Sequence, residues 1–163
     1  MIRNILLAGA SVIGLTAAAW AADTPVQEID VEVDLTAIQN PEAAQVFTNL
    51  SDDLKNAIAA RLAPDRLVDT GGSKIDINID EVELSSTWAN LSDLSQSKLK
   101  GLVNISSDTD GLKFDNYTLT VAYPEATAFV PEGANPDTLT QDAGIYYTAL
   151  INAFADQVVA NLK

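Results

Sequence analysis

The chain has 163 residues, enough for one domain with a buried core, and 47% of them are hydrophobic. Its formal net charge of −14 should repel nucleic acids and anionic lipid headgroups alike. The absence of cysteine excludes disulfides, thiolate chemistry and a lipidated N-terminal Cys, and the absence of histidine removes the usual general base and the commonest transition-metal ligand.

Residues 1–21 have the pattern of a cleavable secretory signal peptide. A short positively charged segment precedes an apolar run over residues 5–19, which is shorter than the ~20 residues needed to span a bilayer. An A-x-A site ends at Ala21, where we expect cleavage; a retained membrane anchor is the alternative. The protein is therefore expected to be periplasmic or secreted, with one domain over residues 22–163 and no stable membrane insertion of the mature chain.

The first half of the mature chain predicts a strand followed by a helix. Apolar and acidic residues alternate strictly over residues 28–35, as in a strand with one buried face. Apolar residues then recur at helical spacing as far as Leu62, after a start signal at Asn40-Pro41 and with Ser51 as a candidate second cap. Residues 66–69 are expected to add a short edge strand, before a turn at two consecutive glycines.

The second half predicts three strands and a helix. Residues 74–84 form a long strand, in which the change of apolar parity predicts a β-bulge near Asp80-Glu81. Two further strands are expected over residues 99–105 and 117–123, the second including Tyr123, with a Gly-containing hairpin between them. An ordered loop should follow, and Thr140 should cap a final helix with apolar residues at every fourth position.

The predicted fold is of the α+β class. The element order β-α-β-β-β-α indicates a two-layer sandwich, with a four- or five-stranded, mostly antiparallel sheet and two amphipathic helices on one of its faces. No internal repeat or linker interrupts it.

One triplet matches an active-site motif. Asp69-Thr70-Gly71 has the sequence of the aspartic-protease triplet, in which two carboxylates share a proton and activate water. One copy of the triplet could act only in a homodimer. A turn between a helix and a strand explains the same three residues.

Acidic residues at alternate positions predict a charged face of the sheet. Candidate metal ligands are Asp30, Asp34, Asp76 and Asp80, accompanied by Glu32 and Asn78. Carboxylate clusters can hold Ca²⁺, which takes six to eight oxygen ligands. The alternative is a solvated outer face, on which Lys98 and Lys100 could pair with some of these acids.

Two aromatic residues fall in predicted loops. Trp88 lies in a polar segment, and Phe129 lies in the Pro-rich segment before the last helix. Because binding residues concentrate in loops, both are candidate partner contacts, with the acidic face steering the encounter.

The order of elements carries a resemblance to a known group of proteins. The segments 51–62, 73–84 and 100–105, followed by an Ala-rich C-terminal helix, resemble small bacterial envelope accessory proteins. These include auxiliary lipoproteins of ABC transport systems and helix-on-sheet domains of outer-membrane assembly factors. This chain departs from the lipoproteins in lacking the lipidation Cys, and the resemblance assigns no functional residues.

The sequence thus favours a non-enzymatic binding or accessory module that acts through contacts with an envelope or secreted protein, as a monomer and without a cofactor. One alternative is a Ca²⁺-dependent adhesion or matrix component. Another is an aspartic-protease-like hydrolase that uses Asp69 in a homodimer.

Overall fold

The computed structural model describes residues 24–33, 47–62, 66–83, 95, 97–107 and 114–162. The expected signal peptide, Asp34, Trp88 and the helix start at Asn40 lie outside these residues, as does the side chain of Asp80.

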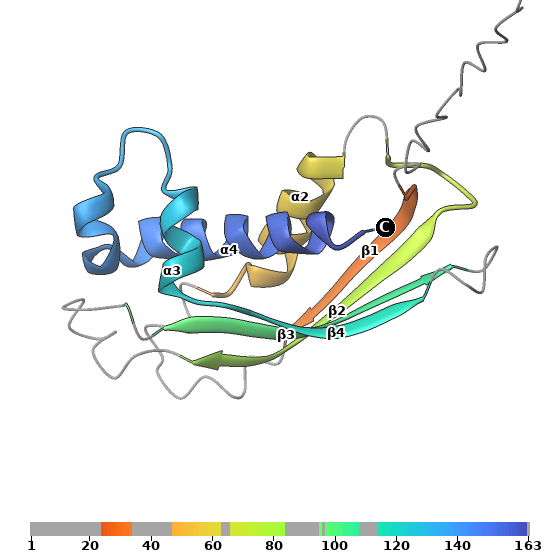
Figure 1. Cartoon of the computed structure of the whole chain (residues 1–163), viewed down its shortest axis with the longest axis horizontal. Coiled ribbons are helices and arrows are strands. Elements are labelled where there is room, and N and C mark those ends of the chain that lie inside the picture. Colours follow the sequence, from red (N-terminus) through yellow and green to blue (C-terminus); the bar gives the residue numbers. More distant parts are fainter. Residues whose placement is uncertain are drawn as a thin grey trace, which may run out of the picture.

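The described strands form one mixed sheet in the order β1-β2-β3-β4 (Figure 1). They are β1 (Val26–Val33), β2 (Ser73–Glu83), β3 (Lys98–Ser107) and β4 (Asp115–Val121). β1 runs parallel to β2, whereas β2, β3 and β4 pair antiparallel with their neighbours. The predicted sheet is confirmed, with four strands.

Two helices cover one face of this sheet (Figure 1). They are α2 (Leu50–Leu62) and α4 (Ala143–Ala160), which contact each other. The apolar stripe of α2, made of Leu50, Leu54, Ile58 and Leu62, is buried throughout, as the helical spacing predicts. In the part of the chain that the structure describes, no helix is both long and apolar enough to cross a membrane.

The core lies between the sheet and the helices. Ile75, Ile77 and Ile79 of β2 are at most 2% exposed and face the same layer as Phe154 of α4. Burying an aliphatic side chain of this size contributes roughly 1.5–3 kcal/mol. The three isoleucines thus supply a large favourable term, which the conformational entropy lost on folding largely offsets.

The predicted β-bulge in β2 is present. Asn78 pairs with Leu102 and Glu81 pairs with Lys100, so two residues of β2 between these pairs stand against one residue of β3. The extra residue restores the register, and Val82 pairs with Leu99.

Tertiary contacts change two predictions in the first half. The expected edge strand at residues 66–69 is reduced to one bridge, in which Leu67 pairs with Val26. Ser51 does not cap a second helix, because α2 already begins at Leu50; its hydroxyl instead donates to the Val31 carbonyl at 2.6 Å and ties the helix to β1.

The segment before the last helix differs most from the prediction. Tyr123 does not extend β4 but opens α3 (Tyr123–Ala126), which is followed by the 3₁₀ turns η3 (Thr127–Phe129) and η4 (Pro136–Gln141). Proline is favoured at a helix start, so Pro124 turns the chain out of the sheet there. Thr140 lies within η4, and Asp142 caps α4 instead by accepting from the Ile145 amide at 3.0 Å.

Candidate docking face

The sheet has a second face, opposite α2 and α4, which we call the outer face. Successive side chains of a strand point to opposite faces of the sheet. In β1, Ile29 and Val31 are therefore buried, whereas Asp30 and Glu32, which alternate with them, are exposed on the outer face. Its described side chains are Glu28, Asp30 and Glu32 of β1, Lys74, Asp76 and Asn78 of β2, Lys98, Lys100, Leu102, Asn104 and Ser106 of β3, and Asn116, Thr118 and Thr120 of β4.

Strand register arranges these side chains in rows across the outer face. One row runs Asp30, Asp76, Asn104 and Asn116, and the next runs Glu32, Asn78, Leu102 and Thr118. Charge is therefore concentrated over β1 and β2, while β3 and β4 contribute neutral side chains to the same rows. The sequence alternation found the acidic half of this surface, but only the register shows where the charge ends.

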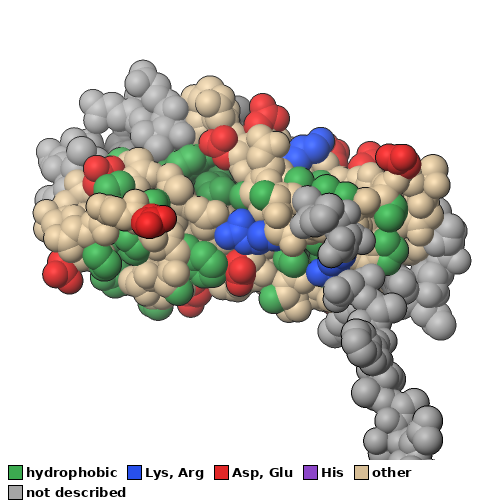
Figure 2. All heavy atoms as spheres, turned by 90° about the horizontal axis from the view of Figure 1, so that it is seen from above, with side chains coloured by type: hydrophobic (Ala, Val, Ile, Leu, Met, Phe, Trp, Pro, Cys, Tyr) green, Lys and Arg blue, Asp and Glu red, His purple; other side chains and the backbone are tan. Residues whose placement is uncertain are grey.

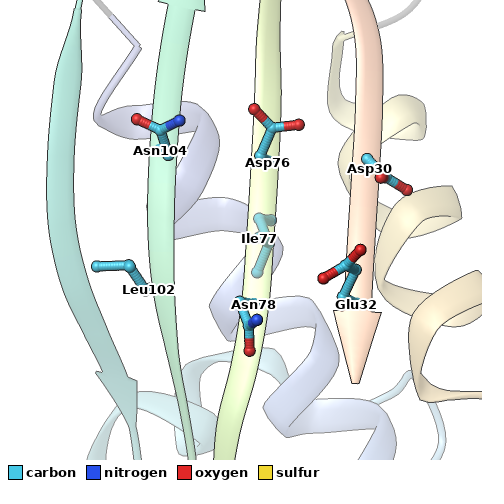
Figure 3. Close-up of a pocket in the computed structure, with 7 residues that line it drawn as sticks. All are labelled: Asp30, Glu32, Asp76, Ile77, Asn78, Leu102 and Asn104. Atoms are coloured by element: carbon cyan, nitrogen blue, oxygen red, sulfur yellow. The ribbon is translucent and has the colours of Figure 1, made fainter. Parts of the chain in front are cut away.

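Two aspartates from neighbouring strands stand opposite each other. Asp30 pairs in register with Asp76, and like charges directly opposite are unfavourable. Figure 3 shows the Asp30 carboxylate turned away from Asp76, whereas the Glu32 side chain leans toward Asn78. This arrangement leaves a concentration of negative charge at one place on the outer face.

Lysines lie in the rows on either side of the two acidic rows. Lys74 forms an ion pair with Glu28, with 3.3 Å between Nζ and Oε2. Lys98 and Lys100 are the register partners of Glu83 and Glu81, and their pairing with acids of the outer face stays a prediction. The register partners of Asp76 are thus Asp30 and Asn104, neither of which carries positive charge.

A shallow hollow of about 310 Å³ lies among the middle rows (Figure 3). Its lining includes carboxylates of β1 and β2, the apolar side chain of Leu102, and Asn104, whose Oδ1 is buried without a hydrogen-bond partner; Ile77 also borders it, although its side chain is in the core on the other face. Leu102 is 40% exposed, although most large apolar side chains of the described strands are in the core. Leu102 was not among the residues predicted from the sequence. Its position could have indicated its exposure, because it alternates with Lys100 and Asn104 and so shares their polar face of β3.

The metal prediction remains a prediction. Among the described side chains, no three acidic groups lie close enough together to hold a metal ion. Two of the four candidate ligands, Asp34 and the side chain of Asp80, lie outside that set.

Phe129 lies in the other layer of the molecule. It belongs to η3, which contacts α4, and its half-buried ring packs against the core. The Cζ atom of Arg61 is 6.0 Å from the ring centroid, and the same guanidinium donates to Asn152 Oδ1 and pairs with Asp156. Phe129 and the acidic rows are therefore on opposite sides of the sheet. Figure 2 shows the helix side, where hydrophobic and acidic side chains are interspersed.

The Asp-Thr-Gly triplet forms the turn that enters β2. Asp69 is exposed, and Gly71 has φ of 77°, which favours glycine. A side chain on Gly72 would come within 2.7 Å of the Gln27 amide nitrogen. The turn therefore requires both glycines, independently of any catalytic role for Asp69.

The two tyrosines with raised pKa values belong to the helix side. Burial raises the pKa of Tyr147, and the Asp53 carboxylate, which accepts from its hydroxyl at 2.6 Å, raises it further. Burial also raises the pKa of Tyr117, with the Asn161 side chain acting in the opposite direction. Both hydroxyls stay protonated at neutral pH, and the Tyr147 hydrogen bond joins α4 to α2.

Comparisons with known proteins establish no family. No family model matches the chain, and no curated protein matches it. Among solved structures, a dodecamer of a PelC variant from Paraburkholderia phytofirmans has a TM-score of 0.34 at 8% identity, covering 79% of this chain and 86% of that one. A candidate lipoprotein from Caulobacter crescentus has a TM-score of 0.32 at 13% identity, covering 82% of this chain and 86% of that one.

Proposed function

We propose that this protein is an exported, non-enzymatic binding or accessory module that acts through contacts with another envelope or secreted protein. The observation that carries the proposal is the outer face, where acidic and neutral polar side chains surround a hollow with Leu102 exposed at 40%. None of the helices that the structure describes packs on this face (Figure 1). An apolar centre with a polar rim is the arrangement found in protein interfaces, and Leu102 among polar side chains fits it on a small scale.

The charge of the outer face supports a binding role. The carboxylates of the outer face are exposed acceptors, suited to pairing with a cationic surface.

Site-specific photo-crosslinking tests the proposal. A crosslinking amino acid is placed at Thr118 on the outer face or at Lys55, an exposed position of α2 on the helix side. We expect a discrete protein adduct from Thr118, and the identified partner, once purified, should bind the exported chain in calorimetry. Adducts from Lys55 alone would assign contact to the helix side, and absence of any adduct would contradict a protein-binding function.

The two competing functions predict different results. A Ca²⁺-dependent adhesion component would bind Ca²⁺ at micromolar concentrations and lose that binding in Asp76→Asn. An acid protease would cleave casein between about pH 3 and 7 in a pepstatin-sensitive reaction abolished by Asp69→Asn, as expected when two aspartates share a proton. Either result would overturn the proposed function.

A further inference from the structure

We propose that the outer face binds an extended, cationic segment of its protein partner, with basic side chains at alternate positions over β1 and β2. This inference rests on the proposed function and adds the chemistry of the partner. Three features of the outer face support it: its charge, the spacing of that charge, and Leu102 beside it.

Charge complementarity selects the sign of the partner. Asp30, Glu32 and Asp76 are exposed, and the register places all three in two adjacent rows over β1 and β2. A guanidinium or ammonium group bound over these strands would form charge-assisted hydrogen bonds with the carboxylates. A neutral or acidic partner would form none of these ion pairs.

Spacing selects an extended segment. Asp30 and Glu32 are two residues apart on one strand, which separates them by about 6.6 Å along β1. An extended peptide presents side chains on one side at the same interval. A segment lying along β1 and β2 can therefore place consecutive basic side chains over Asp30 and Glu32, whereas a helix would place neighbours on one face about 5–6 Å apart at every third or fourth residue.

The apolar part of the hollow suits the stems of such side chains. Lysine and arginine bury their methylene groups against apolar surface while the charged ends stay in water. Leu102 is 40% exposed in the row of Glu32 and Asn78, and thus borders the charged half of the outer face. The hollow of about 310 Å³ is at the lower end of the ~300–1,000 Å³ typical of ligand pockets. It therefore has room for individual side chains but not for a bulky organic ligand.

Peptide binding measured by NMR tests the inference on the exported, full-length mature chain. The probe is a capped peptide with the alternating sequence Arg-Thr-Arg-Thr-Arg, and the control is Arg-Arg-Arg-Thr-Thr, which has the same composition. We expect chemical-shift changes centred on β1, β2 and Leu102, and at least threefold tighter binding of the alternating peptide. Equal binding of the two peptides, or changes centred on the helix side, would overturn the inference.

Matched variants separate this contact from general attraction to an acidic protein. The double variant Asp30→Asn/Asp76→Asn should weaken peptide binding about three- to tenfold, since exposed ion pairs each contribute modestly. Glu132→Gln/Asp137→Asn changes the net charge equally at two exposed acids before α4 and should change binding less than twofold. Equal losses of affinity in the two double variants would mean that only the net charge of the protein matters, and would overturn the inference.

The apolar contact has its own pair of variants. Leu102→Thr should weaken binding about twofold or more, while Leu67→Thr, at a position with the same 40% exposure, should not. Equal effects of the two would contradict the role of Leu102.

A calcium titration tests the alternative that the aspartates bind a metal ion. Calcium ions alone, at millimolar concentration, should leave the resonances of the outer face unchanged. Saturable shifts there would assign the aspartates to a metal instead.

The outcome separates this inference from the proposed function. If crosslinking at Thr118 captures a partner that binds in calorimetry, but neither the peptide nor the aspartate variants behave as expected, the protein is a binding module with a different partner chemistry. If crosslinking and peptide binding both fail, the proposed function fails with the inference.

Discussion

Among single residues, the aspartates of the outer face are placed where their charges lower the stability of the folded state. Asp30 and Asp76 are register partners on two parallel strands whose inner residues are buried, so neither can leave the outer face without moving its neighbours into water, and the Asp30 carboxylate turns away from Asp76 (Figure 3). Sites arranged for binding commonly retain such unfavourable pairs, because the partner relieves them.

The first prediction concerns this pair. Asp76→Asn should raise the free energy of unfolding by about 0.5 kcal/mol, because it removes one negative charge from a strand position in register with another aspartate. Urea denaturation near pH 7 at low salt measures the change, which should shrink as salt screens the charges. Asp137→Asn, the control at an exposed position of η4, should leave stability nearly unchanged. A destabilised Asp76→Asn protein would show that the carboxylate has a favourable partner.

The second prediction concerns the hydrogen bond between α4 and α2. Tyr147→Phe removes the donor to Asp53 Oδ2 and should lower the free energy of unfolding by roughly 1–2 kcal/mol, because the acceptor is a carboxylate. The edge-on contact between the aromatic ring at position 147 and the Phe47 ring, with 5.1 Å between the centroids in the parent protein, should persist. Thermal and urea unfolding at neutral pH measure the loss; an unchanged stability would contradict a contribution from this bond.

The same tyrosine predicts an alkaline dependence. Unfolded tyrosine titrates near pH 10, whereas burial and Asp53 hold the pKa of Tyr147 above that value in the folded state. Above about pH 10 the unfolded state therefore releases a proton that the folded state keeps, and the stabilising contribution is lost as pH rises. The difference in stability between the parent protein and Tyr147→Phe should shrink above about pH 10; a constant difference would contradict the raised pKa.

At the scale of elements, β3 makes room for the helix layer with a glycine. A side chain on Gly101 would lie 2.7 Å from Ile79 Cδ1, 3.0 Å from the Asn78 carbonyl oxygen and 3.4 Å from the Phe154 ring. Gly101→Ala should therefore lower the free energy of unfolding by about 1–3 kcal/mol through overpacking. Gly144→Ala is the control, because its added methyl meets only Asp142 Oδ1 at 3.5 Å; it should be neutral or stabilise by up to about 1 kcal/mol. A stabilised Gly101→Ala protein would mean that the core has free space there.

Elements with strong local periodicity were predicted well, and those set by tertiary contacts were not. The alternation in β1 and the bulge in β2 follow from side-chain parity, which the sequence records directly. The end of β4 does not: Tyr123 continues the apolar alternation, yet it begins α3 and its ring stacks on Tyr146, with 6.5 Å between the centroids. Tyr146 is anchored in turn by its hydroxyl, which donates to the Ser97 carbonyl at 2.9 Å. Contacts between distant segments thus override the local pattern.

At the scale of the whole molecule, charge predicts the state of association. The net charge is −14, and a two-fold contact through the outer face would bring its carboxylates together. We expect the mature chain to be a monomer at physiological salt, as measured by light scattering after size-exclusion chromatography. A dimer that strengthens with rising salt would contradict this expectation, because screening would then be enough to allow a self-contact through the acidic rows.

The fold class, the order of the main strands and helices and the acidic half of the outer face follow from residue periodicity and composition, which act locally along the chain. Strand pairing and layer packing place Asp76 between Asp30 and Asn104, set Lys98 and Lys100 in register with Glu83 and Glu81, and leave Leu102 exposed. Layer packing also places Phe129 beneath Arg61, on the side of the sheet opposite the aspartates. The physical reason is that strand register and layer packing depend on contacts between residues far apart in the chain, and no local pattern specifies them.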